Sequence, residues 1–180
     1  MGALKIEELP HYTYEDYTHW EGRWEIIHGI AYAMSPTAMI NHQIISNKVA
    51  SELTRMFQEC DMCSVLLPVD WKISDDTIVR PDNSVICYEP KNDAYITKSP
   101  MMIFEILSKS TFKKDTSTKF DLYEKEGVLY YVIVDPDDKV AKVYELREGK
   151  YVKIKDATDE NVLFEGEGCE VKFDFGAVFN

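Results

Sequence analysis

Three acidic residues of this sequence stand inside apolar stretches, where ionised side chains are unusual. Glu25 lies in "RWEIIHG", Asp82 in "RPDNSVIC" and Glu105 in "MMIFEILS". A carboxylate in an apolar setting is costly unless a cation pairs with it or coordinates to it. Carboxylate oxygens are also the ligands that hard divalent cations such as Mg²⁺ prefer. The three acids therefore indicate a metal site, provided that the fold brings them together.

Each acid also has a purely structural interpretation. Asp82 follows a proline, and this dipeptide often makes a turn. Glu25 could be an exposed strand residue that pairs with Arg23 or Arg80. Glu105 is the hardest to explain in this way, because its neighbours leave little polar surface. A structural salt bridge to Lys119 is its main alternative.

The elements that must position these acids alternate between strands and helices. Apolar runs bounded by turn residues predict strands within 23–35, 64–74, 77–88, 101–108 and 128–135, and a hairpin over 139–155. Helical spacing and capping residues predict helices over 13–22, 39–60 and 115–127. The continuous apolar run at 101–108 is typical of a central strand buried on both faces. With no linker or repeat, this order favours one domain over 1–180, of the α/β (α+β) class, with a central mixed β-sheet flanked by helices.

Two of the predicted helices carry informative side chains. In 39–60 the apolar residues at helical spacing predict a single buried face; they are Ile40, Ile44, Ile45, Val49, Leu53, Met56 and Phe57. In 115–127, Lys119 and Tyr123 are four residues apart and share one helix face. That face could point towards the strand end that bears Glu105.

Several segments of the sequence together resemble a known protein family. The segments "WEIIHGIAYAMSP", "RPD", "FEILSKST" and "YYVIVDP", in this order, resemble the putative restriction endonuclease family of the PD-(D/E)XK nuclease superfamily. The resemblance runs from about Tyr14 to Tyr151 and implies a restriction-endonuclease-like fold. It also implies that Asp82 and Glu105 are metal ligands, together with the backbone carbonyl of Ile106. Glu25 would be an additional acid, and the cofactor would be Mg²⁺ or Mn²⁺.

One departure from the superfamily pattern concerns its catalytic lysine. The position two residues after the glutamate is Leu107, which cannot serve. The resemblance favours Lys119 on the following helix as the replacement, with Lys109 as the competing candidate. The catalytic set implied is therefore Asp82, Glu105 and Lys119.

The net charge and the cysteines of the sequence limit which partners and which cellular location can be expected. The net charge of −12 argues against non-specific binding of nucleic acid by the whole surface, but the segment 109–119 is basic. The four cysteines include the pair Cys60 and Cys63, but no second pair or suitably spaced histidines for zinc, so we interpret them as ordinary thiols. No signal peptide or membrane-spanning run is visible, and we expect a cytoplasmic protein with no membrane partner.

These observations predict a Mg²⁺-dependent endonuclease acting on DNA, with the segment 109–119 meeting the phosphate backbone. A homodimer is expected, because nucleases that cut both strands commonly pair two chains. The missing motif lysine motivates the main alternative, a catalytically inactive nuclease-fold protein that serves as a binding or regulatory module. A hydrolase of another class of phosphoester is a third possibility.

Overall fold

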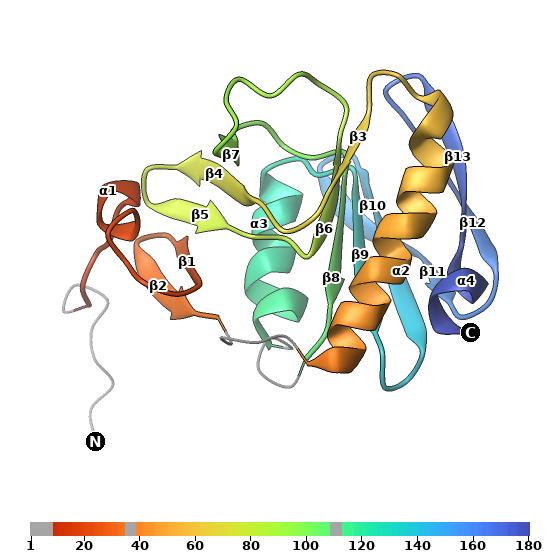
Figure 1. The fold of residues 1–180 in the computed structure, drawn as a ribbon, viewed down its shortest axis with the longest axis horizontal. Coiled ribbons are helices and arrows are strands. Elements are labelled where there is room, and N and C mark those ends of the chain that lie inside the picture. The colour runs from red at the N-terminus through yellow and green to blue at the C-terminus, as the bar shows by residue number, and fades with distance from the viewer. Residues whose placement is uncertain (1–8, 35–38, 109–112) are drawn as a thin grey trace.

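A central six-stranded sheet forms the middle layer of the computed structural model, which describes residues 9–34, 39–108 and 113–180 (Figure 1). Its strand order is β11–β10–β9–β8–β6–β3. The strands are β3 (Ser64–Leu66), β6 (Asn83–Ile86), β8 (Met102–Ile106), β9 (Tyr130–Asp135), β10 (Val140–Arg147) and β11 (Lys150–Ala157). β8 and β9 are parallel and the other neighbours are antiparallel, which confirms the predicted mixed sheet.

A second sheet packs beside the first and includes the N-terminal hairpin. Its order is β2 (Ile30–Ala33), β1 (Trp24–Ile27), β5 (Thr77–Val79), β4 (Asp70–Ser74) and β7 (Tyr95–Ile96). His28 and Gly29 both have positive φ angles, 51° and 76°, as a two-residue hairpin turn requires. The preceding helix α1 (Tyr14–Tyr17) has Thr13 as its N-cap, so it starts where predicted, but it ends earlier than expected.

The remaining elements cover the two faces of the six-stranded sheet. One face is covered by α2 (Ile40–Met56), its 3₁₀ extension η2 (Phe57–Glu59), the hairpin β12 (Asn161–Gly166) and β13 (Cys169–Asp174), and α4 (Phe175–Phe179) (Figure 1). The other face is covered by the second sheet, the π-helical turn η3 (Lys114–Thr118) and α3 (Lys119–Lys125). Strand β7, the β12–β13 hairpin and α4 were not predicted from the sequence.

Strand β8 is the central, doubly buried strand that its apolar run predicts. All five of its residues are buried. Because side chains alternate along a strand, Phe104 and Ile106 pack towards α2, whereas Ile103 and Leu107 pack towards α3 and the second sheet. Glu105 shares the second face, so the pleat alone directs its carboxylate towards α3.

Helix α2 buries a narrower face than predicted. Ile45, Val49 and Leu53 are buried, but Ile40 and Ile44 are 80% and 48% exposed, so the prediction was wrong for these two residues. Both residues lie on a side of α2 that faces away from the sheet, because only one face of a helix packs against a sheet.

The neighbours Ile44 and Ile45 offer a matched test of this orientation. Ile45→Val should lower the free energy of unfolding by about 0.5–1.5 kcal/mol, because it leaves a small cavity in the core. Ile44→Val should change it by less than about 0.5 kcal/mol. Denaturant titration measures both, and equal effects of the two substitutions would contradict the orientation of α2.

The prediction that the cysteines are ordinary thiols was wrong. The structure pairs Cys60 with Cys169 and Cys63 with Cys87 as disulfides, and leaves no cysteine free. Both pairs join segments that are distant in the sequence, so only the tertiary fold reveals them.

Candidate active site

Asp82 and Glu105 meet because of the register between two strands. β6 and β8 are antiparallel with Asn83 opposite Phe104, which places the residue before β6 across from Glu105. The backbone N–H of Ile106 donates to Oδ2 of Asp82 at 2.8 Å. The Pro-Asp dipeptide thus does more than make a turn, since its carboxylate is fixed at the end of the central strand.

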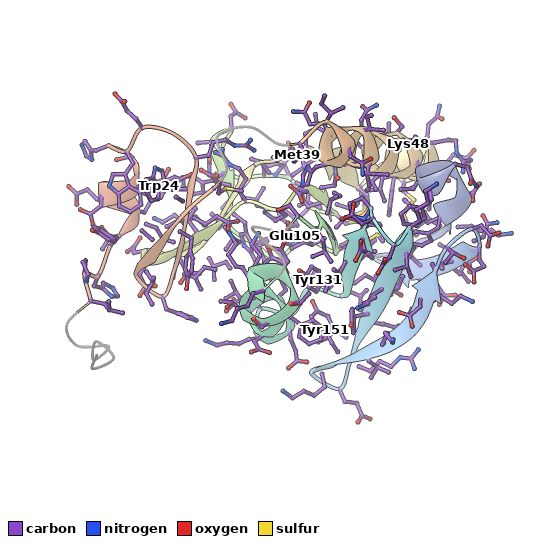
Figure 2. All side chains as sticks on the ribbon, turned by 90° about the horizontal axis from the view of Figure 1, so that it is seen from below. Trp24, Met39, Lys48, Glu105, Tyr131 and Tyr151 are labelled. Atoms are coloured by element: carbon purple, nitrogen blue, oxygen red, sulfur yellow. A yellow bond between two sulfur atoms is a disulfide. The ribbon has the colours of Figure 1, made fainter. Side chains whose placement is uncertain are left out.

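Glu105 is 2% exposed and lies in the interior of the protein (Figure 2). Two side chains of α3 hold it. Its Oε1 accepts hydrogen bonds from Nζ of Lys119 and from the hydroxyl of Tyr123, both at 2.8 Å. The two donors are four residues apart, as the sequence predicted for one helix face. Glu105 is therefore both buried and paired.

Lys119 lies at the centre of a carboxylate cluster and is 2% exposed. Its Nζ is 2.8 Å from Oε1 of Glu105, 2.9 Å from Oε1 of Glu25 and 3.6 Å from Oδ1 of Asp115. Burial disfavours the ammonium ion, but these three carboxylates outweigh it and raise the pKa of Lys119 above its ordinary value. Because it is buried, Lys119 does not lie on the surface that was expected to meet a phosphate backbone.

Glu25 is fully buried, so the interpretation of an exposed strand residue was wrong. Its Oε1 also accepts a hydrogen bond from the backbone N–H of Arg80 at 2.9 Å, and its Oε2 pairs with Lys114. Burial opposes ionisation of Glu25, but the ammonium groups of Lys119 and Lys114 lower its pKa below the ordinary value. The guanidinium of Arg80 turns away and pairs with Asp70.

The π-helical turn η3 explains why two lysines reach Glu25. Lys114 and Lys119 are five residues apart, and in an α-helix such residues point about 140° away from each other. A π-helix forms its hydrogen bonds between residues five apart and brings them onto one side. The N–H of Lys119 donates to the carbonyl of Lys114 in this way. The extra residue in the turn thus aligns both ammonium groups.

Negative charge exceeds positive charge in this cluster. The groups concerned are the carboxylates of Glu25, Asp82, Glu105 and Asp115 and the ammonium groups of Lys114 and Lys119. Burial, and then the carboxylates of Asp115, Asp82 and Glu25, raise the pKa of Glu105 well above its ordinary value, although Lys119 opposes the shift. Burial is the main cause of this shift, and the carboxylates around Glu105 outnumber the ammonium groups.

The donor set fits a hard divalent cation. Asp82 and Glu105 offer carboxylate oxygens from adjacent strand ends, and a Mg²⁺ ion commonly takes one or two carboxylates together with water and phosphate. Within the described residues, no group of three or more His, Cys, Asp or Glu side chains already has the arrangement of a metal site. A two-carboxylate site of the Mg²⁺ type does not require one.

His42 lies in the first turn of α2 and contacts the site. Its Nε2 is 3.1 Å from Oδ2 of Asp82. Burial disfavours the imidazolium, but the hydrogen bond to Asp82 and the negative charges of Asp82 and Asp115 raise the pKa of His42 above its ordinary value.

This pairing predicts a pH-dependent contribution to stability. In chelator-treated protein, NMR titration should give His42 a pKa above about 6.5, and Asp82→Asn should lower it. Because the folded-state pKa is raised, the stabilisation is complete below the unfolded-state pKa and is lost as pH rises through the folded-state value. His42→Gln should therefore destabilise the protein more at acidic than at alkaline pH. A pKa of His42 that does not respond to Asp82→Asn would contradict the pairing.

The structure thus brings Glu25 and Glu105 together at Lys119, and it fixes Asp82 beside them at the backbone N–H of Ile106. Leu107 is buried in the apolar core and cannot supply a charge. The competing candidate Lys109 lies outside the described residues. Sequence reasoning did not assign Lys114 to the site, because an α-helical spacing would direct it elsewhere.

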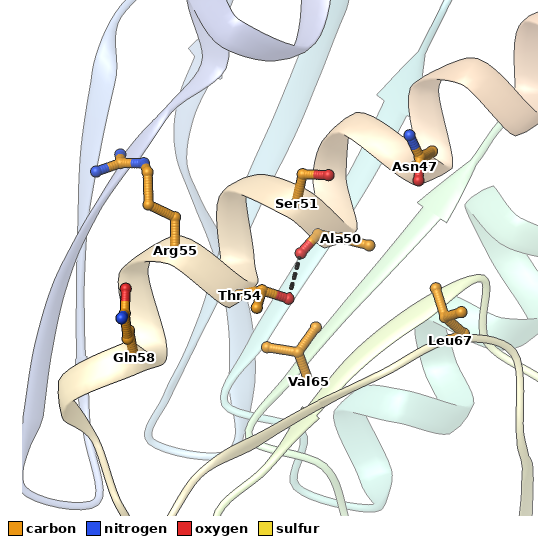
Figure 3. Close-up of a pocket in the computed structure, with 8 residues that line it drawn as sticks. All are labelled: Asn47, Ala50, Ser51, Thr54, Arg55, Gln58, Val65 and Leu67. Carbon is orange, nitrogen blue, oxygen red and sulfur yellow. Dashed lines mark hydrogen bonds between the residues drawn. The ribbon is translucent and has the colours of Figure 1, made fainter.

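An open groove of about 760 Å³ lies between α2 and β3, away from this cluster (Figure 3). Its lining includes Asn47, Ser51, Thr54 and Arg55 from α2, and Leu67 beyond β3. None of the predicted site residues lines it. Its size alone does not make it a candidate active site.

Comparisons with known proteins identify the family and the fold. A family model described as "Putative restriction endonuclease" matches residues 13–173. The structure is similar to the crystal structure of a putative nuclease belonging to DUF820 from Anabaena variabilis, with a TM-score of 0.72, 16% identity, and coverage of 93% of this chain and 97% of that one. A DrdV–DNA complex matches with a TM-score of only 0.33, 16% identity, and coverage of 64% of this chain and 12% of that one. No protein of curated function matches the sequence.

The similarity to the Anabaena protein confirms a restriction-endonuclease-like fold. None of the helices in the described part of the chain is long and apolar enough to cross a membrane.

Proposed function

This chain belongs to the putative restriction endonuclease family, and we propose that it is a Mg²⁺- or Mn²⁺-dependent endonuclease that hydrolyses phosphodiester bonds in DNA. The observation that carries the proposal is the convergence of Asp82, Glu105 and Lys119 on one face of the central sheet. Two carboxylates can hold the divalent ion that assists phosphodiester hydrolysis, and a lysine can stabilise the negative charge that develops.

In this proposal the position of each residue determines its role. Asp82, Glu105 and the carbonyl of Ile106 would hold the metal ion, and Glu25 would contribute directly or through water. A bound Mg²⁺ supplies a water of lowered pKa and stabilises negative charge on the phosphate oxygens. Lys119 lies 2.8 Å from Glu105, so it would orient a water held next to that carboxylate.

Lys114 and Tyr123 would act as positioning residues. Lys114 pairs with the far oxygen of Glu25, and Tyr123 donates to the same oxygen of Glu105 as Lys119 does. Both contacts fix carboxylates that would otherwise repel one another. Such supporting contacts commonly affect metal affinity by about 10–100-fold.

The inactive binding module remains the second candidate, because the buried Leu107 occupies the position of the motif lysine. The two functions differ in what the cluster does. In an inactive module the Lys119–Glu105 pair would be a permanent structural salt bridge, and a divalent ion would not displace any part of it.

Calorimetric titration with Mg²⁺ and Mn²⁺ separates the two functions. The wild type should bind, and Glu105→Gln should not. Glu52→Gln is a matched control, because Glu52 is also a buried glutamate but pairs with Arg55 on α2, outside the site. Cleavage of duplex, single-stranded and branched DNA would then be screened with the same three proteins.

The outcomes are distinct. Metal binding together with Glu105-dependent cleavage supports the endonuclease. A folded wild type that binds neither ion, alone or with DNA, would contradict the metal mechanism and favour the module. Cleavage of a small phosphodiester that DNA does not inhibit would instead point to the third possibility, a hydrolase for another phosphoester.

A second copy of the chain is the proposed partner, because nucleases that cut both strands of a duplex commonly pair two active sites. Sedimentation velocity with and without DNA tests this. A protein that stays monomeric while it cuts both strands would contradict the dimer.

A further inference from the structure

Two disulfides bring four distant cysteines to one end of the six-stranded sheet. Cys60 follows η2 and pairs with Cys169 at the start of β13, with their Cα atoms 6.2 Å apart. Cys63 precedes β3 and pairs with Cys87, which follows β6, with a Cα–Cα distance of 4.0 Å. β3 and β6 are antiparallel neighbours in register, so their ends place the second pair opposite each other.

The two disulfides lie next to each other in the structure. The N–H of Cys63 donates to the carbonyl of Cys60 at 2.9 Å, closing a tight turn that holds the two Cα atoms within about 7 Å. On the other side, Sδ of Met101 lies 3.7 Å from Sγ of Cys87. Gly166 pairs with Cys169 across the β12–β13 hairpin. A Cβ atom added to Gly166 would lie 3.1 Å from Sδ of Met101. The side chain of Met101 therefore spans from Cys87 to the hairpin end that carries Cys169.

This arrangement supplies the second pair of sulfur ligands that the sequence did not reveal. A Cys-x-x-Cys turn joined by two further cysteines from other segments is the ligand set of a four-cysteine zinc site, with tetrahedral geometry and Zn–S distances of about 2.3 Å. Sulfurs bonded to each other cannot act as thiolate ligands. While both disulfides are present, the four cysteines therefore cannot bind a metal ion, and no group of three or more metal-binding side chains is found among the described residues.

We propose that reduction of the two disulfides converts these four cysteines into a binding site for Zn²⁺. A dithiol reductant supplies two electrons and two protons to each disulfide, and is itself oxidised to a disulfide. The four thiols then lose their protons as they bind the metal ion.

The location gives the metal a structural role and a route of access. The cluster joins the end of α2, the edge strand β3, the end of β6 and the β12–β13 hairpin, which otherwise come from separate parts of the chain. A cavity of about 230 Å³ lined by Cys87, Met101 and Glu167 opens next to the second disulfide. Zn²⁺ would hold the same segments together when the disulfides are reduced.

Co²⁺ is the probe for this site, because thiolate ligation gives it charge-transfer and tetrahedral ligand-field absorption. Full-length protein reduced and handled without oxygen should show these bands, and one equivalent of Zn²⁺ should remove them. The oxidised protein should show neither. Zn²⁺ should also raise the thermal unfolding temperature of the reduced protein only.

The variant Cys87→Ser with Cys169→Ser keeps the Cys60–Cys63 turn and removes the other two ligands. Its affinity for Co²⁺ should fall at least a hundredfold. If it does not fold, Cys169→Ala alone should lower the thiolate-to-cobalt intensity while circular dichroism shows a native fold. Glu105→Gln should leave the thiolate bands unchanged, which separates this site from the proposed Mg²⁺ site.

Two results would overturn the proposal. One is a folded, reduced wild type with four titratable thiols and no thiolate-to-cobalt band. The other is unchanged affinity in the Cys87→Ser, Cys169→Ser variant, which would mean that the turn alone binds the ion. Neither result depends on whether the protein cleaves DNA.

Discussion

Lys119→Met is expected to lower the free energy of unfolding by about 3–5 kcal/mol, because it leaves buried acids without their cation. Lys119 is 2% exposed and contacts Glu25, Glu105 and Asp115. Methionine fills a similar volume but carries no charge. The loss should be smaller at acidic pH, because Glu105, whose folded-state pKa is already raised, then takes up a proton in the folded protein.

Lys150→Met is the matched control for this substitution. Lys150 also pairs with a glutamate, Glu124, but its side chain is 80% exposed, so its loss should barely change the free energy of unfolding. Denaturant unfolding of both variants measures the difference. Adding Glu105→Gln to Lys119→Met should restore part of the stability, since the double variant buries one acid fewer. Equal effects of the two lysine substitutions would show that the carboxylate cluster does not depend on Lys119.

Glu105→Gln is expected to reduce metal-dependent cleavage by at least about 10²–10³-fold, the range seen when one electrostatic stabiliser is removed from an active site. Glutamine keeps the shape of the side chain and can still contact Tyr123, so the fold should survive. Because burial and neighbouring carboxylates raise the pKa of Glu105, the wild type should release a proton when it binds the metal. Metal affinity should accordingly weaken as pH falls below that pKa.

Calorimetry in two buffers of different ionisation enthalpy measures the proton release. Glu52→Gln, outside the site, should leave both the release and any cleavage unchanged. A Glu105→Gln protein that binds metal with the same affinity and the same proton release would remove Glu105 from the ligand set.

The central part of the site could be predicted because two local patterns coincide there. The continuous apolar run around Glu105 predicts a buried strand, and the spacing of Lys119 and Tyr123 predicts one helix face. The register between β6 and β8 then brings Asp82 to Glu105. Each of these steps depends on neighbours in the sequence or on a single strand pairing.

Other features depended on information that is not local. The segment 156–174 holds seven acids and one lysine and resembles a solvated loop, yet Val162, Phe164, Val171 and Phe173 alternate inwards and form the β12–β13 hairpin. That period of two was present in the sequence but was obscured by the charges. The pairing of the cysteines has no such signal, because it arises only when α2, β6 and the hairpin pack together.

The π-helical turn before α3 makes the length of one segment as important as its composition. Side chains within 116–118 could change while Lys114 and Lys119 still meet at Glu25, provided that the number of residues between the two lysines stays the same. A chain shorter by one residue there would form an ordinary helical turn, with its lysines four apart and a different phase towards the sheet. Alignments of this family should therefore be read for gaps at this turn, since a single deletion would remove a cation from the cluster without altering any of its acids.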